Sequence, residues 1–210
     1  MLPELACGWW MPQSPAAFRQ VTLIAATLGI WKKIKALLGG KKNWEEVEFF
    51  DPRWKKRIEA MAAHVSSGQS VLDLGCGQMW LKEFLPEDCR YFPCDYTHRG
   101  PGTIVCDFNQ KEFPDQTVDV SFVSGCLEYV VDVDWFLDRI EAQSQRCVIA
   151  YCIMAPDKSI AQREQNAWKN HLSEEELITA FTSRGMLLRE RGGQFMSSHL
   201  FVFEKESGED

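Results

Sequence analysis

The sequence predicts an α/β protein with a doubly wound, mostly parallel sheet. Short apolar segments with the length of buried strands alternate with amphipathic segments, which is typical of such sheets. One of them, Val71–Leu74, leads directly into Gly75 and Gly77, which indicates a strand, a tight turn and a helix over residues 78–84. Since ligands of these sheets bind beyond the carboxyl ends of the strands, we expect the site at this turn.

The composition favours a small-molecule substrate. The chain has 210 residues, 45% hydrophobic and 25% charged, which is usual for one globular domain. Residues 1–60 carry 10 Lys and Arg against 6 Asp and Glu, whereas residues 61–210 carry 13 against 24. The acidic main body argues against extended nucleic-acid binding, which needs a basic surface.

The cysteines predict neither a metal site nor a disulfide framework. None of the 8 Cys residues forms a Cys-x-x-Cys pair, and none of the 4 His residues stands near them at ligand spacing. Several lie inside apolar runs, where a free thiol behaves as a small hydrophobic group. We therefore expect reduced thiols and a cytoplasmic protein.

Three segments are predicted: an extension over residues 1–50, a domain over 51–205 and a tail over 206–210. The extension holds an apolar run, residues 21–31, followed by a basic segment, residues 32–42. The run is shorter than the ~20 residues that span a bilayer, and its charge follows it, unlike that of a signal peptide. The segment could be a helix on an anionic membrane surface, a helix packed on this domain or a protein partner, or a poorly ordered extension.

The remaining pattern defines the sheet. The connection between Asp95 and Thr103 has too few residues for a helical crossover, so we expect a loop there. Two final strands linked by Gly192-Gly193 and polar residues predict an antiparallel hairpin. The predicted strands are residues 71–74, 90–94, 103–106, 118–124, 147–152, 186–191 and 199–203, and the further helices begin at Asp51, Asp132, Ser159 and Ser173.

The glycine turn departs from a dinucleotide fingerprint. Trp80 stands where the third glycine of Gly-x-Gly-x-x-Gly is needed, and Asp73 would repel a pyrophosphate. A nicotinamide oxidoreductase is therefore disfavoured. An acid at this place suits a ligand with its own positive charge, such as the ammonium of a methionine moiety.

The segment Asp73-Leu74-Gly75-Cys76-Gly77 resembles the first motif of class I S-adenosylmethionine-dependent methyltransferases, which has the form acid-x-Gly-x-Gly. Val118–Ser124 with Leu127-Glu128-Tyr129 is similar to the strand and "LEH"-like residues of the small-molecule (type 11) members, with Tyr129 where many relatives carry His. The resemblance covers roughly residues 50–205. It implies a Rossmann-like sheet, S-adenosylmethionine as cofactor and methyl transfer.

Two acids at consecutive strand ends support a nucleotide-like cofactor. Asp95 lies 20 residues after Gly75, where a doubly wound fold places an acid that accepts hydrogen bonds from the ribose hydroxyls. The resemblance implies that Asp107 accepts from the adenine amino group and that Phe108 packs on the ring. Tyr96 and His98-Arg99, in the short loop, are candidates for covering the adenine side. The expected cofactor-binding residues are Asp73, Gly75, Cys76, Gly77, Asp95, Tyr96, Asp107, Phe108 and Ser124.

The acceptor side is less defined. The first and fourth strand ends should place the sulfonium near Gly75 and Ser124, with the acceptor beside Glu128 and Tyr129. These two residues and His171 are the candidate catalytic residues. We expect methyl transfer to a sugar, a glycan precursor or another metabolite. The alternative is a non-catalytic S-adenosylmethionine-binding partner or sensor.

Overall fold

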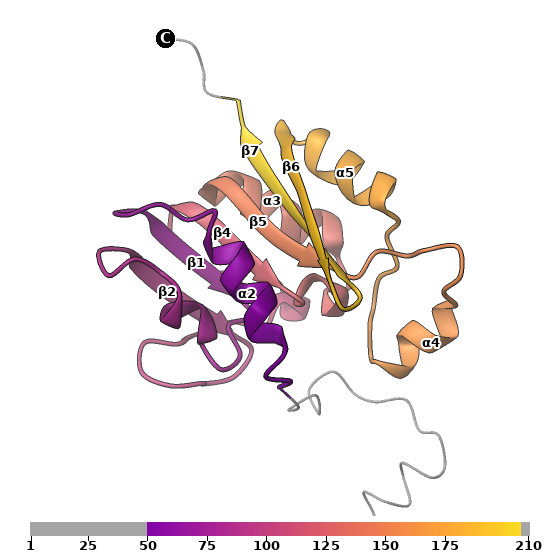
Figure 1. Ribbon diagram of the computed structural model, residues 1–210, viewed down its shortest axis with the longest axis horizontal. Helices are drawn as coiled ribbons and strands as arrows, with labels where there is room; N and C mark the ends of the chain where they lie inside the picture. The colour runs from indigo at the N-terminus through magenta and orange to yellow at the C-terminus, as the bar shows by residue number, and fades with distance from the viewer. Residues whose placement is uncertain (1–49, 207–210) are drawn as a thin grey trace, which may run out of the picture. The chain divides into compact units, whose positions relative to one another are not determined.

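The computed structural model describes residues 50–206. Their strands form one sheet of order β3-β2-β1-β4-β5-β7-β6 (Figure 1). Neighbouring strands run parallel except β7, which is antiparallel to both β5 and β6. The strands are β1 (Ser70–Leu74), β2 (Arg90–Asp95), β3 (Ile104–Val105), β4 (Val118–Ser124), β5 (Ser144–Tyr151), β6 (Met186–Phe195) and β7 (Ser198–Lys205). The predicted α/β sheet with its terminal antiparallel hairpin is confirmed.

Helices cover the sheet unevenly. The α-helices are α2 (Trp54–Ala62), α3 (Val133–Gln143), α4 (Ile160–Gln165) and α5 (Glu174–Thr182), and the 3₁₀ turns are η2 (Trp80–Glu83), η3 (Phe108–Gln110) and η4 (Leu127–Tyr129). In Figure 1, α2 lies in front of the sheet and α3 behind it. The helix predicted to begin at Ser173 is present and has a capping box there: the Ser173 hydroxyl accepts from the Glu176 N–H, and the Glu176 carboxylate accepts from the Ser173 N–H.

Two apolar layers hold the sheet between them. One joins α3 and α5 to the sheet through side chains such as Phe136 and Phe181. The other joins α2 and η2 to the opposite face through Met61, Leu81 and Phe122. Burial on both faces is what a parallel sheet requires, and it explains the unbroken apolar runs in the sequence.

The helix predicted over residues 78–84 is wrong in kind. Only the 3₁₀ turn η2 forms there, and Met79 before it has a left-handed φ of 54°. Pro86 follows closely, so the segment is too short for a cooperative α-helix. No helix dipole therefore stands behind the glycine turn, and the anion site it would create is absent from the described residues.

Two connections test the loop predictions. The segment between β2 and β3 contains no helix, as its length predicted. The hairpin prediction was wrong in one detail, since Gly192 and Gly193 lie inside β6 and the chain reverses at Met196 and Ser197. The register shifts between Arg191 and Gln194, which is where the two glycines interrupt the regular pairing.

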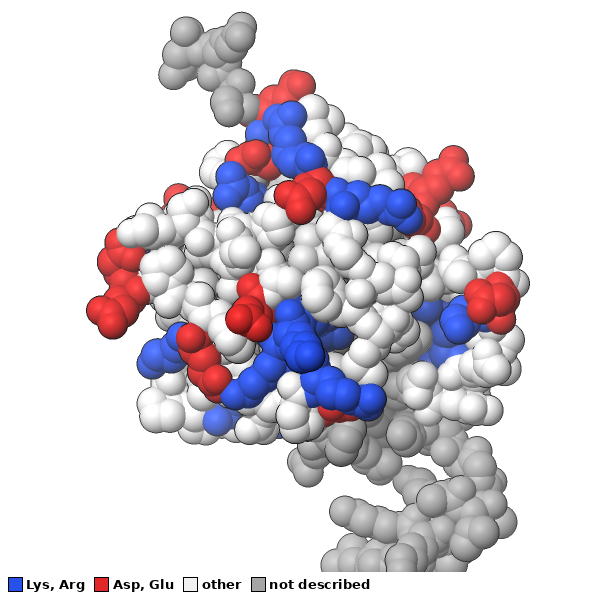
Figure 2. All heavy atoms as spheres, viewed as in Figure 1, with Lys and Arg blue, Asp and Glu red and all other residues white. Residues whose placement is uncertain are grey.

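The described surface has mixed charge on the face seen in Figure 2. Lys and Arg side chains gather over α2, with acidic side chains beside them. Lys55 Nζ lies 2.6 Å from Glu83 Oε2, and Arg53 Nη2 lies 2.5 Å from Asp51 Oδ2. In this part of the chain no helix is both long and apolar enough to cross a membrane. The predictions for residues 1–49, including the apolar and basic helix, lie outside the described residues.

Candidate active site

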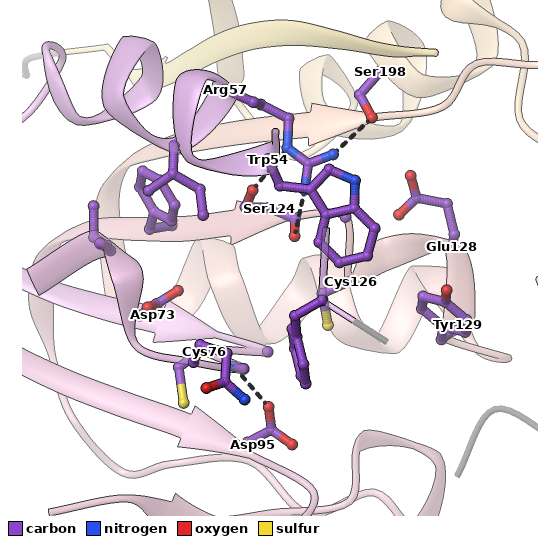
Figure 3. Close-up of a pocket in the computed structure, with 18 of the residues that line it drawn as sticks. Trp54, Arg57, Asp73, Cys76, Asp95, Ser124, Cys126, Glu128, Tyr129 and Ser198 are labelled. Atoms are coloured by element: carbon purple, nitrogen blue, oxygen red, sulfur yellow. Dashed lines mark hydrogen bonds between the residues drawn. The ribbon is translucent and has the colours of Figure 1, made fainter. Parts of the chain in front are cut away.

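A cavity of about 240 Å³ lies at the carboxyl ends of β1, β2 and β4. Its walls come from α2, the turn after β1, the loop after β2, the segment around η4 and the start of β7 (Figure 3). Every residue that the sequence assigned to the cofactor lines it, as do Glu128 and Tyr129. His171 is not among its lining residues.

The glycine turn forms the floor of the cavity. Gly75 and Gly77 have φ values of +79° and +50°, in the left-handed region that favours glycine. A Cβ on Gly75 would lie 2.7 Å from the Cβ of Cys126, and one on Gly77 would lie 2.5 Å from the Phe50 ring. Side chains are therefore excluded here, and the main chain itself faces the cavity.

The N–H groups of this turn are already in use. Gly75 and Cys76 both donate to the carbonyl of Cys94 at 2.9 Å, and Gly77 donates to Asp95 Oδ2 at 2.9 Å. Met79 donates to the carbonyl of Cys76. A phosphate cradle needs such groups to be free and aimed at the ligand, so this turn does not provide one.

Asp95 has one carboxylate oxygen bound and one open. Its side chain is buried and its Oδ2 accepts from Gly77. Its Oδ1 has no hydrogen bond within residues 50–206, although Arg99 Nε lies 3.1 Å away without the geometry of one. The Arg99 cation offsets part of the cost of burying this oxygen, which can still accept a hydrogen bond from a ligand.

Aromatic and cationic side chains cover this end of the cavity. The Arg99 guanidinium lies 5.2 Å from the Tyr96 ring centroid and 5.3 Å from that of Phe50. The sequence had indicated both Tyr96 and Arg99 for this cover, whereas Phe50 enters from the segment before α2. The missing crossover helix is thus replaced by stacked side chains from two loops.

The two residues predicted to bind adenine, Asp107 and Phe108, already have contacts within the protein. Asp107 lines the cavity, and its Oδ1 accepts from the Asn109 N–H at 2.9 Å. Phe108 also lines it but is 8% exposed, because its ring packs 5.0 Å from that of Phe136 and 5.7 Å from that of Phe113. Only a small part of the Phe108 ring is left for a ligand.

Asp73 is a buried acid with a single phenol partner. The Tyr91 hydroxyl donates to its Oδ2 at 2.7 Å. Burial raises the pKa of Asp73 to about 7, the hydrogen bond from Tyr91 opposes the rise, and the nearby Asp95 charge adds to it. A positive group in the cavity would favour the ionised form of this acid.

Arg57 is the main residue that sequence reasoning missed. From α2 its Nε donates to Ser124 Oγ at 3.1 Å, and its Nη1 donates to Ser198 Oγ at 3.0 Å (Figure 3). Burial lowers the pKa of this guanidinium, which nevertheless stays a cation. The available signal was its position, since an arginine interrupts the apolar face formed by Trp54, Ile58 and Met61.

Glu128 closes the acceptor end of the cavity. It is 2% exposed, and its Oε1 accepts from the Cys152 N–H at 2.8 Å. Its Oε2 has no hydrogen bond with any residue in the described range. Burial raises the pKa of Glu128, so this carboxylate is a stronger proton acceptor than an exposed one.

The other two candidate catalytic residues have partners. Burial raises the pKa of Tyr129 to about 12, and a hydrogen bond with Trp168 opposes the rise. His171 Nδ1 accepts from Arg163 Nε at 3.1 Å, and partial burial together with that cation lowers the pKa of His171. The structure therefore brings Glu128 and Tyr129 to the cavity but leaves His171 in a separate arginine-centred network.

The strand order, with its terminal antiparallel hairpin, is the fold of class I S-adenosylmethionine-dependent methyltransferases. One similar structure is the Haloferax volcanii complex of the Trm112 methyltransferase activator and a putative methyltransferase, with a TM-score of 0.58 and 17% identity over 74% of this chain and 91% of that one. No protein-family model and no curated protein sequence matches the chain.

Two further structures contain bound S-adenosylhomocysteine. The Burkholderia thailandensis 1,6-didemethyltoxoflavin-N1-methyltransferase gives a TM-score of 0.57 at 14% identity, covering 95% of this chain and 94% of that one. The Synechocystis PCC 6803 magnesium protoporphyrin IX methyltransferase gives 0.58 at 12% identity, covering 86% and 95%. At these identities the likeness establishes the fold.

Proposed function

We propose that this protein transfers a methyl group from S-adenosylmethionine to a small-molecule acceptor. The open oxygen of Asp95, buried at the end of β2 beside the glycine turn, is the observation that carries the proposal. A ribose diol offers O–H donors to such an acceptor, and the hydrogen bond to a charged group makes the contact strong. Gly75 and Gly77 line the same cavity, where the rest of the donor would lie.

The glycine turn is better suited to bind the methionine part of S-adenosylmethionine than a pyrophosphate. Its N–H groups are consumed by Cys94, Asp95 and Cys76, so little is left to bind phosphate. Asp73 and Asp95 also give this part of the cavity two carboxyl groups, which favour a ligand with an ammonium and a sulfonium. Asp107 and Phe108, which also line the cavity, are proposed to contact the adenine.

The cofactor, when bound, supplies an already activated methyl group. The protein must then hold the nucleophile in line with it and exclude water. Glu128 is placed to accept a proton from a hydroxyl or amine acceptor through its open Oε2. Tyr129 and Trp168, joined by a hydrogen bond, form a wall beside it.

The proposed acceptor is of metabolite size. Two of the similar structures are methyltransferases named for 1,6-didemethyltoxoflavin and magnesium protoporphyrin IX, both small molecules. For this chain a sugar, a glycan precursor or another metabolite is proposed. A cytoplasmic location is part of the proposal, supported by seven free cysteines in the described residues.

Calorimetric titration of the full chain with S-adenosylmethionine, S-adenosylhomocysteine and NAD⁺ tests the donor. We expect heat from both adenosyl ligands and none from NAD⁺. Absence of heat with both adenosyl ligands would overturn the proposal, whereas binding of NAD⁺ alone would indicate an oxidoreductase.

Incubation with methyl-labelled donor and a metabolite extract tests turnover. We expect label in a small molecule, and we expect Glu128→Gln to retain S-adenosylhomocysteine binding but to lose labelling of that product. A wild-type protein that binds the donor and labels nothing in extracts of varied origin would favour the sensor alternative.

A further inference from the structure

Arg57 is a buried cation without a carboxylate partner. It is 8% exposed, yet no Asp or Glu in residues 50–206 lies within ion-pairing distance of its guanidinium. Arginines are almost never this buried unless they are paired. Its described partners are neutral: the Ser124 hydroxyl, the Ser198 hydroxyl and, at 3.5 Å, the Ser124 carbonyl.

These bonds leave part of the guanidinium unused. Arginine has five N–H donors in a planar fork. The three bonds engage Nε once, Nη1 once and Nη2 once, so each terminal nitrogen keeps one N–H without a described acceptor. These two N–H groups are charge-assisted donors that a carboxylate can accept.

The cavity gives that carboxylate a place to lie. Arg57 lines the cavity, and its Nη2 lies 3.1 Å from where a Cβ on Gly125 would be, so the guanidinium rests over a bare stretch of main chain. The Trp54 ring, 5.6 Å from the guanidinium carbon, covers one side of it (Figure 3). Glu128 is near enough to favour the cation without bonding to it, which preserves the fork for a ligand.

We infer that Arg57 anchors the carboxylate of a molecule bound in this cavity. Two sources have this chemistry: the amino-acid end of the methyl donor, and an acid group on the acceptor. The first source rests on the proposed function, whereas the second can be tested without it.

The donor arm compares two ligands of the full chain by calorimetry. S-Adenosylhomocysteine has the carboxylate, and 5′-methylthioadenosine has the same adenosine and thioether without it. For the donor source, we expect Arg57→Gln to weaken S-adenosylhomocysteine binding at least about tenfold and to leave 5′-methylthioadenosine binding unchanged. Arg53→Gln is the matched control, since it makes the same change one turn earlier at a side chain that is 72% exposed.

The acceptor arm uses NMR to measure the binding of benzoate and of its uncharged analogue benzamide to protein loaded with S-adenosylhomocysteine. If the carboxylate belongs to the acceptor, benzoate binds to the wild type and not to Arg57→Gln, benzamide binds to neither, and donor binding is unaffected. If neither S-adenosylhomocysteine nor benzoate depends on Arg57, the inference is overturned.

Two outcomes separate folding and donor failures from the inference. Arg57→Lys keeps the buried positive charge but removes the guanidinium group. It replaces Arg57→Gln in these experiments if Arg57→Gln does not fold. Equal loss of both adenosyl ligands in the folded Arg57→Lys variant would show a structural role and overturn the inference. If the wild type binds neither adenosyl ligand, the proposed function fails, and the benzoate arm on the free protein still decides the role of Arg57.

Discussion

The two halves of the sheet are built differently. Strands β4 to β7 are joined through α3, α4 and α5, and most residues of β5 and β7 are buried. Strands β1 to β3 are joined without an α-helix, by the 3₁₀ turn η2 and a loop; β1 is buried throughout, but the edge strand β3 has one half-buried and one exposed residue. The predicted donor site lies on this second half. The comparison indicates that one half stabilises the sheet while the other presents main chain and loop side chains to a ligand.

The largest expected effect is in the helix-covered half. Phe181 on α5 stacks on Phe203 of β7 with ring centroids 4.0 Å apart, and both are fully buried. Phe181→Ala should lower the free energy of unfolding by about 3–5 kcal/mol in urea denaturation. Phe92→Ala on half-buried β2 should cost clearly less. Equal losses would contradict the division into two halves.

The glycine turn after β1 should tolerate substitution of Gly75 poorly, although no α-helix follows it. Gly75→Ala places a Cβ against Cys126, whereas Gly102→Ala, at a similar φ of +84°, meets nothing within 4 Å. We expect about 1–2 kcal/mol of destabilisation at Gly102 from the left-handed backbone alone, and about 1–3 kcal/mol more at Gly75 from the clash. Thermal unfolding of the two variants measures the difference, and similar melting temperatures would argue against a tight turn.

Loss of the Asp95 carboxylate should affect binding more than folding. Asp95→Ala should weaken S-adenosylhomocysteine about 10- to 100-fold, since hydrogen bonds to a charged acceptor disappear. The control is Asp88→Ala, which removes an exposed acid that accepts from the Ser67 hydroxyl and does not line the cavity. Calorimetry that gives the same affinity for Asp95→Ala and wild type would mean that another acid binds the ribose.

The smallest expected effect is a pH dependence from Asp73. Its pKa is about 7 in the free protein, and an ammonium nearby would lower that value. The ionised form then binds the donor better, so affinity should rise as pH increases through 7, by at most about tenfold for a shift of one unit. Asp73→Asn should abolish the rise. A profile that stays flat in the wild type would place the ammonium away from Asp73.

The sequence predicted the parts that depend on local pattern. The glycine turn, the acid 20 residues beyond Gly75 and the absent crossover after Asp95 all follow from spacing along the chain. Arg57 could not be found in this way, because its partners lie 67 and 141 residues away. The helix after the turn was mispredicted because an amphipathic pattern says nothing of the left-handed Met79 that limits its length.

The position of Arg99 has a consequence for product release in the proposed reaction. In many enzymes the departure of product limits the rate, and leaving a buried carboxylate bare makes departure costly. Here the Arg99 side chain is 13% exposed and stays 3.1 Å from the same Asp95 oxygen that the ribose is proposed to use. The carboxylate therefore faces a cation as soon as the nucleoside leaves. In the proposed methyltransferase, this ion pair between Arg99 and Asp95 would ease the exchange of S-adenosylhomocysteine for S-adenosylmethionine.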